Sequence, residues 1–447
     1  MRIIFQNIQQ AQVFNRANTN QNIPQSRLSP IRQTLSHDTV AFGKKKTTRT
    51  KSGNGSIQQL TLNNRKGVYR ITRVGDYYNL LYAYNSEIGT VNVNQIRLNK
   101  TRVERIVGTS SLKAANSRIN EAKVTGNAEL RGRSRIKTLK VEPVDYETKA
   151  PTGNVSLYGS SSVKDLQAGS LRDYKEYAPQ TVRYTGNISL HDNSSVGNLY
   201  ANTLSAYDGS TVTIAVIRDE AYLVGNSSVG SLCANTLSAY DKSKITTARV
   251  EDKAVLFNSS SVGSLYADTL SAYGESKITT AAVYGAYLND DSSVETIDAD
   301  HLSADGRSTI KTARITDSTS LDNDSSVESL ETGTLMTDGN SKIKVAKVRG
   351  DVWLDSVENV EELHLIGETP NRKVTIANLT EALPNTKKLK LYLSDAVKTL
   401  EISTKDENRS IMLDRLELIW ENSKKAVSTS DLDLLTGKLK VVVKKIV

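Results

Sequence analysis

The sequence predicts an all-β protein, a single-stranded parallel β-helix (β-solenoid) with triangular coils of about 16–17 residues, preceded by a disordered N-terminal arm. Three observations predict this fold class. A serine-valine unit recurs about every 33 residues, apolar residues come in pairs two positions apart, and only 7 of the 447 residues are proline. A fixed period of this size is typical of proteins whose units pack only on their neighbours.

The spacing inside the repeat predicts three walls per coil. Leu265 pairs with Ala267 and Leu270 pairs with Ala272, and steps of five, five and six positions complete one coil. Residues i and i+2 of a strand point to the same face, so each pair marks a short wall with two inward side chains. The serines that lead the recurring unit are Ser162, Ser195, Ser228, Ser261, Ser293 and Ser326.

The recurring unit spans two coils, and this doubling of the period has a packing explanation. One coil carries a large-then-small pair, Leu270/Ala272, and the next carries a small-then-large pair, Ala286/Leu288. A narrow interior reaches the packing density of native proteins when bulky and small side chains alternate along each column. We therefore expect leucine to stack on alanine from coil to coil.

Looser copies of the pattern extend the predicted solenoid over residues 56–447. The coils are most regular over residues 110–365, irregular over 56–109, and less regular over 366–447. Proline is scarce because a backbone that serves a continuous ladder needs its amide donors.

Residues 1–55 are predicted to form a disordered basic arm. They are rich in Asn, Gln, Ser and Thr and carry nine Lys/Arg against a single acid, Asp38. Such a composition cannot bury a core. The arm is a simple flexible tail, or it resembles an organelle transit peptide or the leader of a type III secreted effector. The apolar run after Met1 is too short for a secretory signal, and no run approaches the roughly 18 apolar residues of a membrane span.

Charge is distributed unevenly, with +8 over residues 1–55, +11 over 56–140 and −10 beyond. A basic cluster in the second segment is a candidate site for an anionic surface such as a membrane or a phosphate backbone. The alternative is a solvated face that discourages lateral strand pairing. No aromatic residues alternate with these cations, which argues against nucleic acid as a partner. The cluster consists of Arg131, Arg133, Arg135 and Lys137.

Catalytic and cofactor signatures were not recognised in the sequence. The four histidines are far apart, Cys233 is the only cysteine, and no glycine-rich phosphate loop occurs. Two acid pairs, Asp290 with Asp291 and Asp322 with Asp324, suggest either calcium sites or solvated turns, and sister coils that lack acids there favour the turns. Glycosidases and lyases built on repeat scaffolds need long insertions for a cleft, whereas these turns are short. We expect no enzyme, no cofactor and no metal.

The C-terminal residues suggest self-association. An uncapped solenoid end exposes unpaired amides and carbonyls that can accept another chain. The candidate residues are Val441, Val442, Val443, Ile446 and Val447. At the other end, the tyrosines over residues 77–84 are candidates for a cap or a docking surface.

Two runs carry a resemblance to known families. Ser-x-Val-x-x-Leu-x-Ala-x-x-Leu-x-Ala at 260–272 and Ser-x-Ile-x-x-Ala-x-Val at 276–283 resemble the coils of bactofilins, polymer-forming bacterial cytoskeletal proteins. They are also similar to the β-helical head of autotransporter adhesins. The resemblance covers most of residues 110–365, although bactofilin cores are shorter and favour glycine at their corners where this chain has serine.

The resemblance implies a bacterial origin and a structural role without transferring any functional residue. We expect a non-enzymatic rod in the bacterial cytoplasm whose main partner is itself, as a scaffold or a cytoskeletal-type polymer. The alternative is an adhesin or effector, secreted without a cleaved Sec signal, that binds a host protein or glycan through its repetitive faces. Filament formation by the purified protein would separate the two.

Overall fold

The computed structural model describes residues 40–42, 59–72, 80–142, 153–168, 186–354 and 359–366, and the strands at 372–376, 388–393, 397–402, 415–420 and 441–445. The chain divides into two units, Met1–His37 and Asp38–Val447. All described residues belong to the second unit. Apart from Val40–Phe42, which form a strand, the arm predicted over residues 1–55 lies outside them.

The described residues form strands joined by turns. The N-terminal strands are β1 (Val40–Phe42), β2 (Gln59–Asn63), β3 (Val68–Thr72), β4 (Leu80–Tyr84), β5 (Glu87–Asn92), β6 (Gln95–Asn99), β7 (Arg102–Ala115), β8 (Arg118–Arg131), β9 (Arg135–Val141), β10 (Val155–Leu157) and β11 (Ser162–Ala168). The central strands are β12 (Asn187–Leu190), β13 (Ser195–Ala201), β14 (Thr203–Ala206), β15 (Thr211–Ile217), β16 (Glu220–Leu223), β17 (Ser228–Ala234), β18 (Thr236–Ala239), β19 (Lys244–Val250), β20 (Lys253–Leu256), β21 (Ser261–Ala272), β22 (Lys277–Leu288), β23 (Ser293–Ala304) and β24 (Thr309–Leu321). The C-terminal strands are β25 (Ser326–Thr332), β26 (Thr334–Thr337), β27 (Lys342–Val348), β28 (Val352–Leu354), β29 (Asn359–Leu365), β30 (Arg372–Ile376), β31 (Lys388–Leu393), β32 (Val397–Ile402), β33 (Arg415–Trp420) and β34 (Val441–Lys445).

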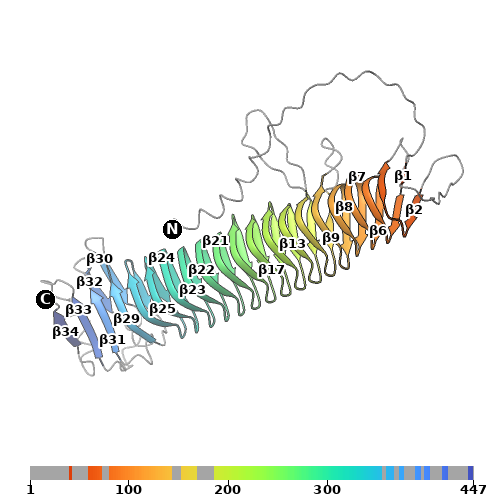
Figure 1. Cartoon of the computed structure of the whole chain (residues 1–447). Coiled ribbons are helices and arrows are strands. Elements are labelled where there is room, and N and C mark those ends of the chain that lie inside the picture. The colour runs from red at the N-terminus through yellow and green to blue at the C-terminus, as the bar shows by residue number, and fades with distance from the viewer. Residues whose placement is uncertain are drawn as a thin grey trace, which may run out of the picture. The chain divides into compact units, whose positions relative to one another are not determined.

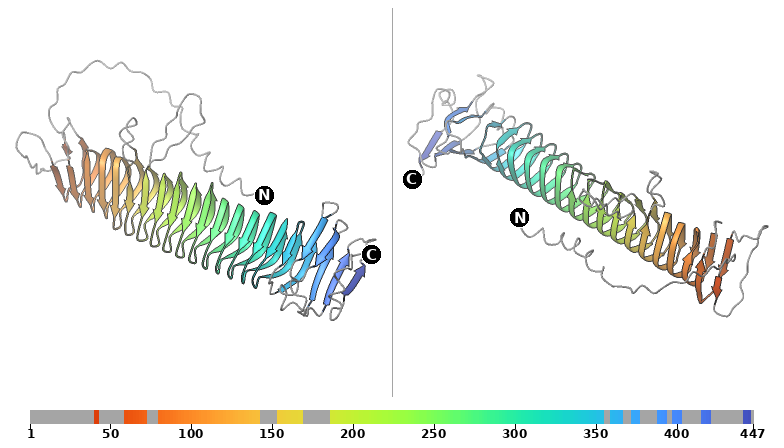
Figure 2. Two further views of the ribbon diagram at one scale, coloured as in Figure 1. Left: turned by 180° about the vertical axis from the view of Figure 1, so that it is seen from behind. Right: turned by 90° about the horizontal axis from the view of Figure 1, so that it is seen from above.

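The strands stack in chain order as the coils of a parallel β-solenoid, which confirms the predicted fold class (Figure 1). Ser261 pairs with Lys277 in the next coil, and Thr309 pairs with Ser326 in the same way. The turned views show the same order of stacking (Figure 2). Of the described strands, 32 belong to one sheet, while β30 and β32 form a separate parallel pair.

The core consists of pairs of inward-pointing side chains that stack on the equivalent pairs of the neighbouring coils. In the coil that begins at residue 260, Leu265/Ala267 and Leu270/Ala272 are buried, as predicted from the two-residue spacing. The third pair consists of Ser260 and Val262, both buried. The apolar pattern of the sequence predicts only the valine of this pair, because serine is not an apolar residue.

Bulky and small side chains alternate along the stacked columns, as expected. Leu270 lies in register between Ala254 in the preceding coil and Ala286 in the next. Leu302 follows Ala286 in the same column. Because neighbouring strands are only about 4.8 Å apart, each leucine fills space that the alanines above and below leave open.

One interval of the recurring unit differs from the expected double coil. Ser162 pairs directly with Ser195, so β11 and β13 lie in adjacent coils although two coil lengths of sequence separate them. Similarly, Arg135 pairs with Ser162, a step that is also longer than one regular coil. Both intervals contain charged segments, 143–152 and 169–185, that carry proline and lack the two-residue apolar spacing.

The coil length is nearly constant from β13 to β29. Each step to the next coil in this region is about 16–17 residues, as predicted. Side chains one coil apart therefore meet outside the core. The Thr280 hydroxyl, for example, donates to the Ser264 hydroxyl at 3.1 Å.

The first strand runs against the direction of the others. β1 pairs antiparallel with β3, whereas β3 pairs in parallel with β5 on its other side. At the C-terminal end β34 pairs in parallel with β33. The sheet therefore begins with an antiparallel strand and reaches β34 through parallel strands.

Candidate functional site

The basic cluster predicted from the sequence lies together at one corner of the solenoid. Arg131 ends β8, Arg133 lies in the following turn, and Arg135 and Lys137 belong to β9; all four are exposed. Arg131 forms an ion pair with Glu129 and its guanidinium lies over the Tyr158 ring, 5.4 Å from the centroid. Within the described part of the chain, the other three cations have no ion pair, so their charge faces solvent.

Only part of the predicted self-association segment is described. Val441, Val442 and Val443 belong to β34, where their backbones pair in register with Leu416, Glu417 and Leu418 of β33. Ile446 and Val447 lie outside the described residues. The structure therefore places the valines on the last described strand of the sheet.

The corner that holds Arg133 recurs in successive coils as a tight turn. In a representative turn, Ser210 donates its backbone N–H to the Tyr207 carbonyl at 3.2 Å, and Asp208 and Gly209 have φ values of 51° and 77°. Positive φ at both central positions is typical of a type I′ turn, which Asn, Asp and Gly tolerate best. The residue before the turn points outward and the serine that closes the turn points into the core.

The residues that precede these turns form a continuous line, which we call the corner column. Each donates its backbone N–H to the coil before it, as Tyr207 does to Leu190 and Tyr240 does to Leu223, both at 2.9 Å. From Arg131 onward the column consists of Arg131, Tyr158, His191, Tyr207, Val224, Tyr240, Phe257, Tyr273, Asn289, Asp305, Asp322 and Asp338.

The central part of the corner column is an aromatic ladder. The Tyr158 and His191 rings stack with centroids 4.8 Å apart, and the His191 and Tyr207 rings follow at 4.9 Å. Tyr240, Phe257 and Tyr273 continue the ladder at 5.0 and 4.7 Å, with interplanar angles of 6° and 10°. These spacings match the distance between strands, because the sheet presents one ring per coil.

A tyrosine from the neighbouring wall bridges the single gap in the ladder. Val224 occupies the column between Tyr207 and Tyr240. Tyr222, two residues earlier, tilts toward both rings, with centroid distances of 6.0 Å to Tyr207 and 5.4 Å to Tyr240. Burial, followed by the neighbouring tyrosines, raises the pKa of the Tyr222 phenol. The ladder is thus unbroken over seven rings.

The last described members of the corner column form a line of carboxylates. Asp305, Asp322 and Asp338 lie in successive coils, each joined to the preceding coil by a backbone hydrogen bond of 2.8 Å. Burial raises the pKa of the Asp322 carboxyl, and repulsion from Asp305 and Asp338 adds to this, while a hydrogen bond from Ser320 opposes it. Among the described residues none of these three carboxylates forms an ion pair.

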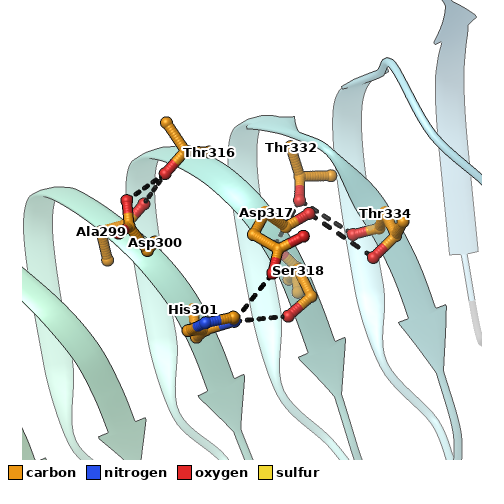
Figure 3. A network of polar contacts seen from close by, with 9 residues as sticks. Ala299, Asp300, His301, Thr316, Asp317, Ser318, Thr332 and Thr334 are labelled. Atoms are coloured by element: carbon orange, nitrogen blue, oxygen red, sulfur yellow. Dashed lines mark hydrogen bonds and ion pairs between the residues drawn. The ribbon is translucent and has the colours of Figure 1, made fainter.

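A second polar cluster surrounds His301 at another corner (Figure 3). A register irregularity adds one residue to β24 opposite Ala299 and His301 of β23. The His301 Nδ1 lies 2.9 Å from the Ser318 hydroxyl and 3.5 Å from an Asp317 carboxylate oxygen in this next coil. Serine, histidine and aspartate are the residues of a hydrolytic triad. In a triad, however, the serine and the carboxylate contact opposite nitrogens of the imidazole, whereas here both lie at Nδ1. The contacts orient the ring without activating Ser318.

This cluster was not predicted from the sequence, because the four histidines lie far apart in the chain. His301 and Ser318 are one coil apart in the sequence, and this spacing was the available signal. His191 belongs to the aromatic ladder, His364 lies 3.6 Å from Glu362, and His37 lies outside the described residues.

The acids considered for calcium have other contacts. Asp291 forms an ion pair with Arg307 of the next coil at 2.7 Å, and Asp290 accepts a hydrogen bond from the Gly274 backbone N–H at 3.4 Å. Among the described residues no group of three potential metal ligands occurs.

A shallow groove near the N-terminal end combines tyrosines and cations. The Arg97 guanidinium donates to the Tyr82 hydroxyl at 2.8 Å and lies over the ring, while the Lys100 ammonium lies over the Tyr84 ring. The predicted docking tyrosines Tyr82 and Tyr84 are therefore already engaged with cations of the following coil, and those at 77 and 78 lie outside the described residues. The residues lining the groove are Thr61, Asn63, Tyr82, Ala83, Tyr84, Arg97, Leu98 and Asn99.

The corner serines form an inner column that the apolar pattern did not predict. Ser134 and Ser161 donate their hydroxyls to carbonyls at the start of their own turns, at 2.8 and 2.6 Å. Ten later members are fully buried, with no hydrogen-bond partner among the described residues: Ser194, Ser210, Ser227, Ser243, Ser260, Ser276, Ser292, Ser308, Ser325 and Ser341. The small side chain fits the inside of a tight turn where a valine would not.

Comparison with known proteins identifies no relative: no family model, no curated protein and no solved structure matches the chain. None of the described residues belongs to an apolar helix long enough to cross a membrane.

Proposed function

We propose that the protein is a non-catalytic structural rod that assembles end to end through the edges of its parallel sheet. This proposal rests on the pairing of β34. One edge of β34 pairs in parallel with β33, and its other edge has no partner among the described strands. A strand edge of this kind presents a row of backbone donors and acceptors to any chain that can continue the ladder.

The regular coil length supports a structural role over a catalytic one. From β13 to β29 the chain keeps one nearly constant length per coil, which leaves little room for loops that could build a substrate cleft. At His301 the Ser318 hydroxyl and the Asp317 carboxylate both lie at Nδ1, whereas a hydrolytic triad places them at opposite nitrogens of the imidazole. The resemblance of the coils to bactofilins supports a cytoskeletal-type scaffold in the bacterial cytoplasm.

Proline substitutions in β34 test the end-to-end contact. Successive backbone N–H groups of a strand point to opposite edges, so Val442→Pro and Val443→Pro each remove a donor from a different edge. One of the two leaves the pairing with β33 intact. We expect the wild-type chain to form chains of rods in electron microscopy, and at least one folded proline variant to lose them. Wild-type assembly by both folded variants, or a wild-type monomer at high concentration, would contradict the proposal.

A second candidate function is the binding of a glycan by a secreted form of the protein. Tyr266, Tyr284 and Tyr287 lie in adjacent coils and are each exposed by half or more, at 60%, 56% and 50%. Exposed aromatic rings provide apolar faces with a polar tip, as binding surfaces do. Binding to a soluble polysaccharide panel that is lost when all three become serine would support this function. Equal binding by the triple variant would exclude these three tyrosines as the binding residues.

A further inference from the structure

The stretch of the corner column from Arg131 to Asp338 has opposite charge at its two ends and aromatic rings between them. Arg131 and, in the following turn, Arg133 stand at one end. Asp322 and Asp338 stand at the other end, in the last two coils of the column. The twelve members lie one per coil, so the two ends are about 50 Å apart at a strand spacing of about 4.8 Å.

Apart from Arg131, which pairs with Glu129, the charges at both ends form no ion pair within the described part of the chain. Arg133 forms no ion pair and is exposed. Asp305, Asp322 and Asp338 repel one another, and their hydrogen bonds come from neutral groups such as Ser320 and the Gly339 backbone N–H. A cation placed against this line would relieve the repulsion between the carboxylates.

The order of the column selects a second copy of the chain in antiparallel orientation. A two-fold axis between Tyr240 and Phe257 places Arg131 opposite Asp338, and His191 opposite Asp305. The aromatic ladder then meets the ladder of the partner. In a parallel pair, arginine would face arginine and aspartate would face aspartate, which is repulsive. A self-complementary patch of this kind is what a symmetric dimer requires.

The size of the surface is sufficient for a specific contact. Standard interfaces bury about 800 Å² on each partner. A corner about 50 Å long reaches that area with a band about 15 Å wide. The rings of the ladder are half-buried in the single chain. Their exposed edges therefore present apolar surface along that band.

We propose that two copies of the chain dock side by side and antiparallel along the corner column, with Arg131 and Arg133 of one copy facing Asp322 and Asp338 of the other. This contact uses the side of the solenoid and is independent of the end-to-end contact through β34. Each can therefore exist without the other.

Charge reversal in two separate chains provides the test. Arg133→Glu in one chain and Asp338→Arg in another each create two repulsive contacts in a homodimer. When the two variants are mixed, both contacts of the mixed pair become attractive again. We expect each variant alone to lose the side-by-side pair by at least about tenfold in dimerisation constant, and the mixture to restore it. Sedimentation gives the constants, and electron microscopy distinguishes side-by-side pairs from end-to-end chains.

The control variant is Lys140→Glu, which changes the net charge by the same amount as Arg133→Glu. Lys140 lies on a different wall of the solenoid and forms no ion pair in the described part of the chain. It should pair like the wild type. Three results would overturn the inference: a wild-type chain without side-by-side pairs, single reversals that still pair, or a mixture that fails to pair although both variants fold. End-to-end chains that persist in any of these cases would leave the proposed rod function intact.

Discussion

The Phe257 ring stacks on the Tyr240 ring with 5.0 Å between centroids and only 6° between planes, and on the Tyr273 ring at 4.7 Å. Phe257→Ala removes both contacts. Since aromatic pairs contribute about 0.5–1.5 kcal/mol each beyond burial, we expect the free energy of unfolding to fall by about 1–3 kcal/mol. Urea denaturation followed by circular dichroism measures the change. Tyr287→Ala is the control, because Tyr287 is half exposed and outside the ladder; an equal loss in both variants would show that the stacking itself contributes nothing.

Leucine and alanine alternate in the core column that contains Leu270, and this alternation should be costly to break. Leu270→Ala places three alanines in succession, at 254, 270 and 286. The cavity should lower the free energy of unfolding by about 2–5 kcal/mol. Ala286→Leu produces the opposite defect, three leucines in succession at 270, 286 and 302, and should cost about 1–3 kcal/mol through overpacking. A neutral result for either variant in denaturation would mean that the coils adjust freely to volume.

Gly263 lies close to the carbonyl oxygen of Thr246 in the preceding coil, which would be only 2.6 Å from a Cβ at residue 263. Gly263→Ala should therefore force the two coils apart and destabilise the protein by about 1–3 kcal/mol. Gly285→Ala serves as the matched control, since its nearest neighbour would be the Tyr287 ring at 3.8 Å. Thermal unfolding of the two variants should differ clearly, and equal melting temperatures would contradict the close approach.

Two carboxylates should affect stability with opposite dependence on pH. Burial raises the pKa of Asp322 above its ordinary value of 3.8, so its charge costs stability as the pH rises through that range and remains a cost at neutral pH. Asp322→Asn should therefore raise the melting temperature at pH 7. The gain should disappear well below about pH 4, where the carboxyl is protonated in both the folded and the unfolded state.

Glu129 should behave in the opposite way. A hydrogen bond from Lys113 and a second one from Arg131 lower the pKa of Glu129 below its ordinary value of 4.5, against the effect of burial. Its charge stabilises the fold above that value, and the stabilisation is lost as the pH falls through the lowered pKa. Glu129→Gln should lower the melting temperature at pH 7 and have no effect in strong acid. Parallel pH profiles for the two variants would refute at least one of the two assignments.

The tertiary structure was needed wherever distant residues share a corner or a column. The basic cluster was visible in the sequence because Arg131, Arg133 and Arg135 are close together in the chain. The aromatic ladder was not, because its rings are one coil apart and Tyr222 joins it from another wall. The direct pairing of Ser162 with Ser195 was also hidden, since their spacing in the chain fits two regular coils as well as one coil with an insertion.

By itself, the sequence determined the solenoid, the coil length and the alternation of leucine with alanine, because a narrow core imposes its packing on every turn of the chain. Only the tertiary structure decided which side chains form continuous lines outside that core. The physical reason is that outward positions accept side chains of several types, so the apolar pattern that marks the core does not mark them. Their neighbours are set by the register between coils, which is where the aromatic ladder, the carboxylate line and the contacts of His301 arise.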